Sequence, residues 1–338
     1  MTRRFFRWLG LVVAVVVLAM SGSPAVAGQG RPGAAPAGGT VRTPWGDPDL
    51  QGDWTSEGEF GVPFERPAEF GDRQELTDEE FAARLAQARE RDKNDIDTVS
   101  VLTGEVDMPT APVPHWREQG TNSRRTSLVI DPPNGRIPPR VVPPAPPGRT
   151  CGGLLTGDPC DSAQDYGLHV RCIIHGAGFP AAMFPTLYNA NLRIVQGPGV
   201  VAITYEMIHD TRVIPLDGRA PLGADIRLWL GDARGHWEGD TLVVESANFT
   251  GKTNYRGSGS TLRLIERFRR VDGESLRYEV TAVDPTTWTA PWTAALDLKG
   301  RPAGLGLFEY ACQEGNYGLF NMLSTARGAE RARAQRQQ

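Results

Sequence analysis

The chain lacks a basic tract, a second long apolar run and the common motifs of nucleotide-binding proteins and serine hydrolases. Its 338 residues carry 36 Lys and Arg against 40 Asp and Glu, a formal net charge of −4, which argues against a nucleic-acid partner. After residue 27, no apolar segment approaches the roughly 20 residues that a membrane-spanning helix needs. Neither a Gly-x-Ser-x-Gly elbow nor a phosphate-binding loop occurs.

The first 27 residues predict a secretory signal peptide. Residues 1–8 are basic and free of acids, residues 9–20 are apolar, and residues 25–27 form a small-residue cleavage site. Residues 2–6 also fit a twin-arginine export signal, and an ordinary Sec signal is the alternative. We therefore expect a periplasmic or secreted protein with no membrane span once the signal is removed.

Cysteine is scarce, with four residues in the chain. In an exported protein this number indicates two disulfides rather than catalytic thiols, and three pairings are open. We favour Cys151 with Cys160, which brackets a turn-rich segment, and Cys172 with Cys312, because a long-loop bridge restricts the unfolded chain most. A metal site built on these cysteines is disfavoured because no Cys-x-x-Cys spacing is present.

The change in amino-acid composition along the chain predicts an N-terminal arm, one β-rich domain and a charged tail. The arm covers residues 28–124, and a capping box formed by Thr77 and Glu80 predicts a helix at about residues 78–92. The domain covers residues 125–326 and ends in a helix expected from Asn316 through Met322. Residues 327–338 form the charged tail.

Short strands separated by Gly and Asp turns predict an antiparallel meander, closed as a barrel or strongly curved. No helical pattern separates them, so a parallel sheet is not expected. The expected strands cover residues 191–196, 200–208, 211–216, 225–230, 241–247, 261–270, 275–283, 288–298 and 305–310.

Polar residues occur on the apolar faces of these strands. Because side chains alternate between the two faces of a strand, Glu266 shares the inner face of residues 261–270 with three hydrophobic residues. Tyr278 is placed near it across the next hairpin, and Arg212 shares a face with Ile214 and Leu216. An inward carboxylate, hydroxyl and cation are therefore expected inside the sheet.

Residues 205–212 hold an acid, a base and a cation in one short stretch. Both faces of residues 200–208 are apolar. The alternation of side chains places Glu206 and His209 on opposite faces. A site is therefore expected to be assembled across several strands. Our candidates for contacts with a substrate are Glu206, Asp210, Arg193, Tyr205, Trp288 and Trp292.

Two interpretations of the inward polar groups stay open. In the catalytic one, His209 transfers protons, Glu266 is the second acid/base, Arg212 stabilises an anion and Tyr278 orients the substrate. In the structural one, Glu266 forms a buried ion pair with Arg212 or Arg193, and the tryptophans fill the core. Neither a metal nor an organic cofactor is expected, since His-x-His and His-x-x-x-His spacings are missing.

Several motifs resemble a family of exported, largely uncharacterised bacterial proteins, and the likeness extends over nearly the whole mature chain. It implies export and a shared fold but names no reaction. The strand pattern also resembles lipocalin-like (calycin) β-barrels, which hold a small ligand in the barrel mouth. The motifs that carry the family resemblance lie at residues 45–52, 125–138, 206–219, 237–245, 266–268 and 310–317.

Together these observations predict an exported enzyme that acts on a small organic molecule by cofactor-independent acid/base chemistry, as a lyase, isomerase or hydrolase. The alternative is a non-catalytic periplasmic protein that binds a small apolar molecule or a sugar. The expected partner is a small-molecule ligand or substrate in either case, and the sequence does not determine the oligomeric state.

Overall fold

A computed structural model describes residues 41–97, 123–141, 161–174, 183–186, 188–252, 256–302 and 304–337. The predicted signal peptide and the pair Cys151 and Cys160 lie outside these residues. Among the residues described, no helix has both the length and the apolar composition needed to cross a membrane.

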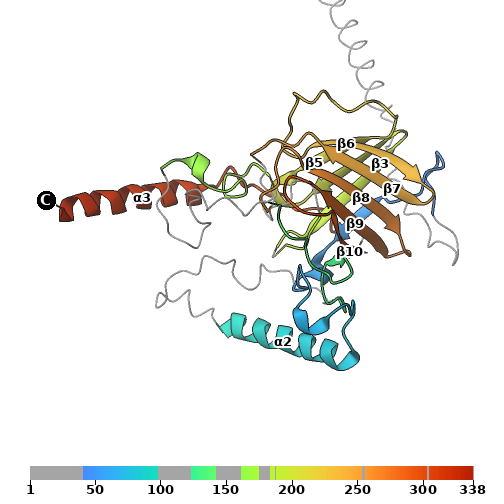
Figure 1. Cartoon of the computed structure of the whole chain (residues 1–338), viewed down its shortest axis with the longest axis horizontal. Helices are drawn as coiled ribbons and strands as arrows, with labels where there is room; N and C mark the ends of the chain where they lie inside the picture. The colour runs from blue at the N-terminus through green and yellow to red at the C-terminus, as the bar shows by residue number, and fades with distance from the viewer. Residues whose placement is uncertain are drawn as a thin grey trace, which may run out of the picture. The chain divides into compact units, whose positions relative to one another are not determined.

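The fold is mainly β, as the sequence predicted, with one antiparallel sheet of ten strands that forms a nearly closed barrel (Figure 1). Hydrogen-bonded neighbours follow the order β5-β4-β3-β1-β10-β9-β8-β7-β6, and β2 pairs with β10 outside this path. The strands are β1 (Gly52–Thr55), β2 (Val129–Asp131), β3 (Asn191–Gly197), β4 (Val200–Tyr205), β5 (Thr211–Pro215), β6 (Asp232–Glu238), β7 (Thr241–Ala247), β8 (Arg263–Arg270), β9 (Ser275–Val283) and β10 (Trp292–Gly300).

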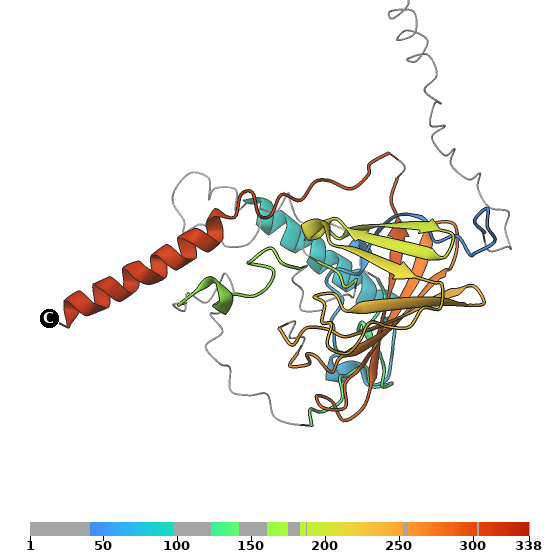
Figure 2. The same cartoon turned by 90° about the horizontal axis from the view of Figure 1, so that it is seen from above.

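The barrel nearly closes where β5 meets β6, the two strands at the ends of this order. A Cβ atom added to Gly235 of β6 would lie 2.6 Å from Leu216 Cδ2 and 2.9 Å from Ile214 Cγ2. Glycine therefore lets the side chains of β5 pack directly on the backbone of β6. Seen from above, the early strands and the later strands curve around a common interior (Figure 2).

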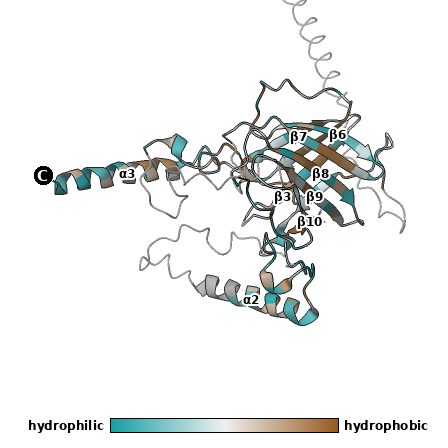
Figure 3. Ribbon diagram, in the orientation of Figure 1, coloured by the Kyte–Doolittle hydropathy of each residue, from teal (hydrophilic) through white to brown (hydrophobic). Residues whose placement is uncertain are grey.

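The core follows the predicted alternation of side chains. Leu264, Glu266 and Phe268 of β8 are fully buried, as are Tyr278 and Val280 of β9. In Figure 3, hydrophobic and hydrophilic residues alternate along the strands of the sheet, as expected when one face of each strand packs inward.

Three details differ from the sequence-based expectation. Residues 225–230 form an exposed loop with one isolated bridge from Leu228 to Phe249, and the strand beside β7 is β6. Residues 305–310 also form no strand, because Gly304 and Gly306 adopt positive φ angles of 90° and 63° that interrupt an extended ladder. The last strand starts at Trp292 rather than near residue 288.

Within the described ranges the chain also forms two α-helices, α2 (Asp78–Asp97) and α3 (Tyr317–Arg336). The predicted capping box starts α2, since Thr77 N donates to Glu80 Oε2 and Glu80 N donates to Thr77 Oγ1. Asn316 caps α3 by accepting from Leu319 N at 3.2 Å. This helix includes most of the predicted charged tail, because Ala, Arg, Glu and Gln favour a helix. The part of the chain that the structure describes also contains four short 3-10 turns: η1 (Glu57–Glu59), η2 (Ala68–Phe70), η5 (Ala163–Asp165) and η6 (Met207–His209).

Candidate functional site

The strongest polar contact inside the barrel joins Arg212 of β5 to Glu266 of β8. Arg212 Nη1 donates to Glu266 Oε1 at 2.9 Å, and Nη2 donates to Oε2 at 2.5 Å. The two side chains are 2% and 0% exposed. A parallel pair of charge-assisted bonds in this geometry is among the strongest that protein side chains form.

Three more polar groups complete this interior cluster, which consists of Arg212, Glu266, Tyr278, Ser246 and Tyr205. Tyr278 Oη donates to Glu266 Oε1 at 2.9 Å, and Arg212 Nη2 donates to Ser246 Oγ at 3.2 Å. Tyr205 Oη accepts from Arg212 Nη1 at 3.5 Å. The cluster therefore joins side chains from β4, β5, β7, β8 and β9 across the barrel.

Burial and the neighbouring charges set the protonation of this cluster. Burial raises the pKa of Tyr205 to about 12, with Arg212 opposing the shift and Glu266 adding to it. Burial raises the pKa of Tyr278 well above its ordinary value, and the negative charge of Glu266 adds to the shift. For Arg212, burial alone would lower the pKa, but Glu266 and Tyr205 outweigh it and raise the pKa. Both tyrosines are therefore neutral and Arg212 is charged near neutral pH.

A small cavity lies where β3 begins and β4 ends, and it has a volume of about 10 Å³. Tyr205 lines this cavity and also contacts Arg212, so one side chain links the cavity to the interior cluster. A space of this size holds about one water molecule. The other lining residues include Ser56, Met183, Phe184, Thr186, Asn189 and Asn191.

Glu206 lies just beyond β4 and is 2% exposed. Asn189 Nδ2 donates to its Oε1 at 2.7 Å, and Asn191 Nδ2 lies 3.1 and 3.2 Å from its two oxygens. Phe308 N donates to Oε2 at 3.1 Å, and Arg301 Nη1 is 3.9 Å away. The carboxylate is therefore held by two asparagines that also line the cavity.

The turn after Glu206 has an unusual backbone. Ile208 has φ 59° and His209 has φ 46°, both in the left-handed region that non-glycine residues rarely adopt. For the β-branched Ile208 this conformation is strained, and such strain is concentrated at functional sites in proteins. The expected strand of residues 200–208 ends at Tyr205, so the alternation that placed Glu206 and His209 on opposite faces does not apply to them.

His209 is exposed, and its Nδ1 lies 3.1 Å from the backbone oxygen of Tyr310. Because a carbonyl oxygen can only accept, Nδ1 carries the proton in this contact, which leaves the Nε2 lone pair as a base. The ring of Tyr310 stacks on Tyr188 with centroids 6.4 Å apart. Burial, reinforced by Tyr188, raises the pKa of Tyr310.

The other predicted site residues are not members of the interior cluster, although Asp210 contacts Tyr205 through its backbone. Arg193 is on the outer face of β3 and forms hydrogen bonds of 2.6 and 2.9 Å with Asp53. Asp210 is half-buried, and its backbone oxygen accepts from Tyr205 N at 2.8 Å. Trp288 and Trp292 are buried and pack edge to face at 5.6 Å.

The predicted disulfide between Cys172 and Cys312 is present. It joins the segment before β3 to the segment before α3, where Tyr166 and Val170 pack against residues of the helix. This cross-link fits an oxidising compartment. It also anchors the segment that supplies Phe308 N to Glu206 and the Tyr310 oxygen to His209.

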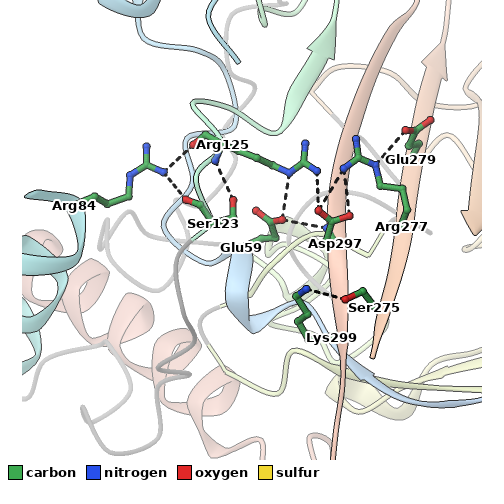
Figure 4. Close-up of polar contacts among 9 residues, drawn as sticks. All are labelled: Glu59, Arg84, Ser123, Arg125, Ser275, Arg277, Glu279, Asp297 and Lys299. Carbon is green, nitrogen blue, oxygen red and sulfur yellow. Dashed lines mark hydrogen bonds and ion pairs between the residues drawn. The ribbon is translucent and has the colours of Figure 1, made fainter. Parts of the chain in front are cut away.

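A second charged cluster lies on the outer face of β9 and β10 (Figure 4). Arg125 contacts Glu59 at 3.3 Å and Asp297 at 2.9 Å, and Arg277 contacts the other oxygen of Asp297 at 3.2 Å. Arg84 of α2 extends the network by donating to the backbone oxygens of residues 123 and 125. This network fastens the segment after α2 to the barrel, and its members are largely paired with one another.

Three polar residues around the cluster and the cavity were missed from the sequence: Ser246, Asn189 and Asn191. Asn189 has φ 53° and precedes β3, so no strand pattern indicates its direction. Asn191 shares the alternation of the exposed Arg193 and is nevertheless buried, which the strand pattern does not indicate. Ser246 does share the inner face of β7, and the alternation Leu242, Val244, Ser246 could have indicated it.

No protein-family model, no curated protein and no solved structure matches this chain. Among the residues described, no group of three or more His, Cys, Asp or Glu side chains is arranged to hold a metal ion.

Proposed function

We propose that this protein is an exported enzyme that acts on a small organic molecule by acid/base chemistry of its own side chains. The reaction is of the lyase, isomerase or hydrolase type and takes place at the end of the barrel where β4 ends. The observation that carries the proposal is the position of Tyr205, which lines the cavity and accepts from the buried Arg212.

The proposed roles follow from the contacts of each side chain. His209 accepts or returns a proton through Nε2, because its Nδ1 is engaged by the Tyr310 carbonyl. Tyr205 orients the substrate, and Arg212 stabilises negative charge that develops next to it. Glu266 acts as a positioning residue because it holds Arg212, and Tyr278 acts through Glu266, to which it donates a hydrogen bond.

The test begins with a substrate search. Wild-type protein and His209→Gln are incubated with an extract of small metabolites, and mass spectrometry finds the compounds that only the wild type consumes. For such a compound, we expect His209→Gln to lower kcat/KM by about 100-fold or more, the usual contribution of a proton-transfer residue. His236→Gln is the matched control, because His236 is exposed on β6 and contacts Glu238. Full turnover by His209→Gln would exclude the assigned role.

A second candidate is a non-catalytic binding protein for a small apolar molecule or a sugar. It is favoured by the mutual pairing of Arg212, Glu266 and Tyr278, which leaves the charged groups compensated inside the barrel. In this case native mass spectrometry would find a ligand bound in a one-to-one ratio and recovered chemically unchanged.

A further inference from the structure

One side of α3 is packed against the chain, and it is formed by Leu319, Met322 and Leu323. These three side chains contact Tyr166 and Val170. They are one, three or four positions apart, so they share one side of the helix. The opposite side of the first turns is left for solvent or for a partner.

Two aromatic rings lie on the exposed side of α3. Tyr317 is 74% exposed and Phe320 is 69% exposed, and residues three positions apart are neighbours on a helix. An aromatic side chain can bury about 150–250 Å², so the two rings together offer about 300–500 Å². A stable protein–protein interface needs about 800 Å² on each partner. The rings alone are therefore too small a patch for such an interface.

The second half of α3 is basic in a chain whose formal net charge is −4. The helix contains four arginines and one acid. Arg327 uses that acid, with Nη2 at 2.6 Å from Glu330 Oε1. Arg331, Arg333 and Arg336 are exposed, and within the part of the chain that the structure describes they form no ion pair. Three cationic groups are therefore available to a negatively charged partner.

We propose that the exposed side of α3 docks on the surface of an anionic phospholipid bilayer. Arg331 follows Phe320 by about three helical turns, so the cation and the ring lie on the same side. Aromatic side chains are favoured at the level of the lipid headgroups, and arginines near an anionic bilayer are attracted by its surface potential. A bilayer needs no shaped surface of the protein, so two rings and three cations suffice. The inference does not depend on the proposed reaction, because α3 contributes nothing to the interior cluster or the cavity.

Co-sedimentation with lipid vesicles tests the proposal. The mature chain from residue 28 onward is used, because the apolar residues 9–20 of the predicted signal peptide would themselves bind lipid. Vesicles of equal parts phosphatidylglycerol and phosphatidylcholine are compared with vesicles of phosphatidylcholine alone. We expect binding to the anionic vesicles to be about 100-fold stronger, from about fivefold for each of three arginines. Added salt should weaken this binding, because it screens the attraction.

The double variant Arg331→Gln, Arg333→Gln should bind the anionic vesicles about 25-fold more weakly. The matched control Arg89→Gln, Arg136→Gln removes the same charge from two exposed arginines outside α3, and it should change binding by less than about twofold. All four positions are exposed, and circular dichroism checks that each variant is folded.

The substitution Phe320→Gln tests the aromatic contribution and keeps a residue that favours a helix. It should weaken binding to the anionic vesicles about tenfold, because part of the ring no longer leaves water. The same substitution at Phe308, which is 62% exposed and lies outside α3, is the matched control and should leave binding unchanged.

Equal binding to the two kinds of vesicle would overturn the proposal, and so would equal losses in either pair of variant and control. If the protein ignores both vesicles but forms a dimer in analytical ultracentrifugation that Phe320→Gln dissociates, the exposed side of α3 binds a second copy of the chain and the lipid proposal is wrong.

Discussion

Arg212 and Glu266 are 54 residues apart in the sequence and form two parallel hydrogen bonds inside the barrel. The pair joins β5, at one end of the hydrogen-bonded strand order, to β8, which lies close to the other end. It therefore fastens the barrel near the place where the ladder of hydrogen bonds is open. A charge left here without its partner would stay buried without a compensating charge.

Replacement of Arg212 by Met should lower the free energy of unfolding by about 3–5 kcal/mol, because Glu266 would stay buried without a cation. The double variant Arg212→Met, Glu266→Leu should recover much of this loss, since no uncompensated charge is left. Urea denaturation of both variants measures the difference. A single variant that loses less than about 1 kcal/mol would show that the pair does not stabilise the barrel.

Alkaline pH should destabilise the protein through Tyr205. Its folded-state pKa is about 12, and the ordinary value is 10.0. A pKa that is raised on folding gives stability that is present below pH 10 and is lost as the pH rises toward 12. The loss should be about 2–3 kcal/mol, from about two units at 1.4 kcal/mol each.

Unfolding free energies measured at several pH values between 9 and about 12 test this prediction. The variant Tyr205→Phe should show a shallower decline, because it removes one titrating group while Tyr278 remains. Identical pH profiles for the variant and the wild type would contradict it.

Removal of the Cys172–Cys312 disulfide should lower stability by about 5 kcal/mol in the chain-entropy model, because the two cysteines are 140 residues apart. The double variant Cys172→Ser, Cys312→Ser is compared with the wild type by denaturant unfolding. Hydrogen exchange should also become faster at Phe308 N, whose contact with Glu206 lies in the anchored segment. Unchanged exchange at this amide would show that the disulfide does not hold the segment in place.

Arg125→Ala should cost about 2–3 kcal/mol, because it leaves the buried Glu59 carboxylate without its ion-pair partner. The matched control is Arg263→Ala, which breaks an exposed pair with Glu245 and should cost less than about 1 kcal/mol. Thermal or urea unfolding measures both. Equal losses in the two variants would mean that burial of Glu59 has no effect on the strength of its pair.

Closure of the barrel depends on the missing side chain of Gly235. The substitution Gly235→Ala would place a Cβ atom 2.6 Å from Leu216 Cδ2 and 2.9 Å from Ile214 Cγ2, so these side chains must shift, at a cost of about 1–3 kcal/mol. Gly223→Ala is the control, because nothing lies within 4 Å of the added atom. A stable Gly235→Ala variant with unchanged packing at Leu216 would show that β5 and β6 do not meet as described.

The sequence by itself determined which way most strand residues face. The alternation of apolar and polar residues predicted that Glu266, Tyr278 and Arg212 point inward, because side chains alternate along any strand whatever its neighbours are. The capping box predicted the start of α2, and the loop-entropy argument favoured the Cys172–Cys312 bridge among three possible pairings. These are local or statistical properties that do not depend on the closure of the barrel.

Only the tertiary structure decided which polar groups meet. Arg193 faces outward to Asp53, whereas Arg212 reaches Glu266, and the sequence allowed either arginine as the partner. The contact depends on barrel closure, which brings β5 opposite β8. The neighbours of Glu206 were also decided by the tertiary structure. Glu206 lies beyond the end of β4, at a turn with a strained backbone, and it accepts hydrogen bonds from Asn189 and Asn191. A periodic pattern gives the direction of a side chain within a strand, but long-range pairing gives its neighbours.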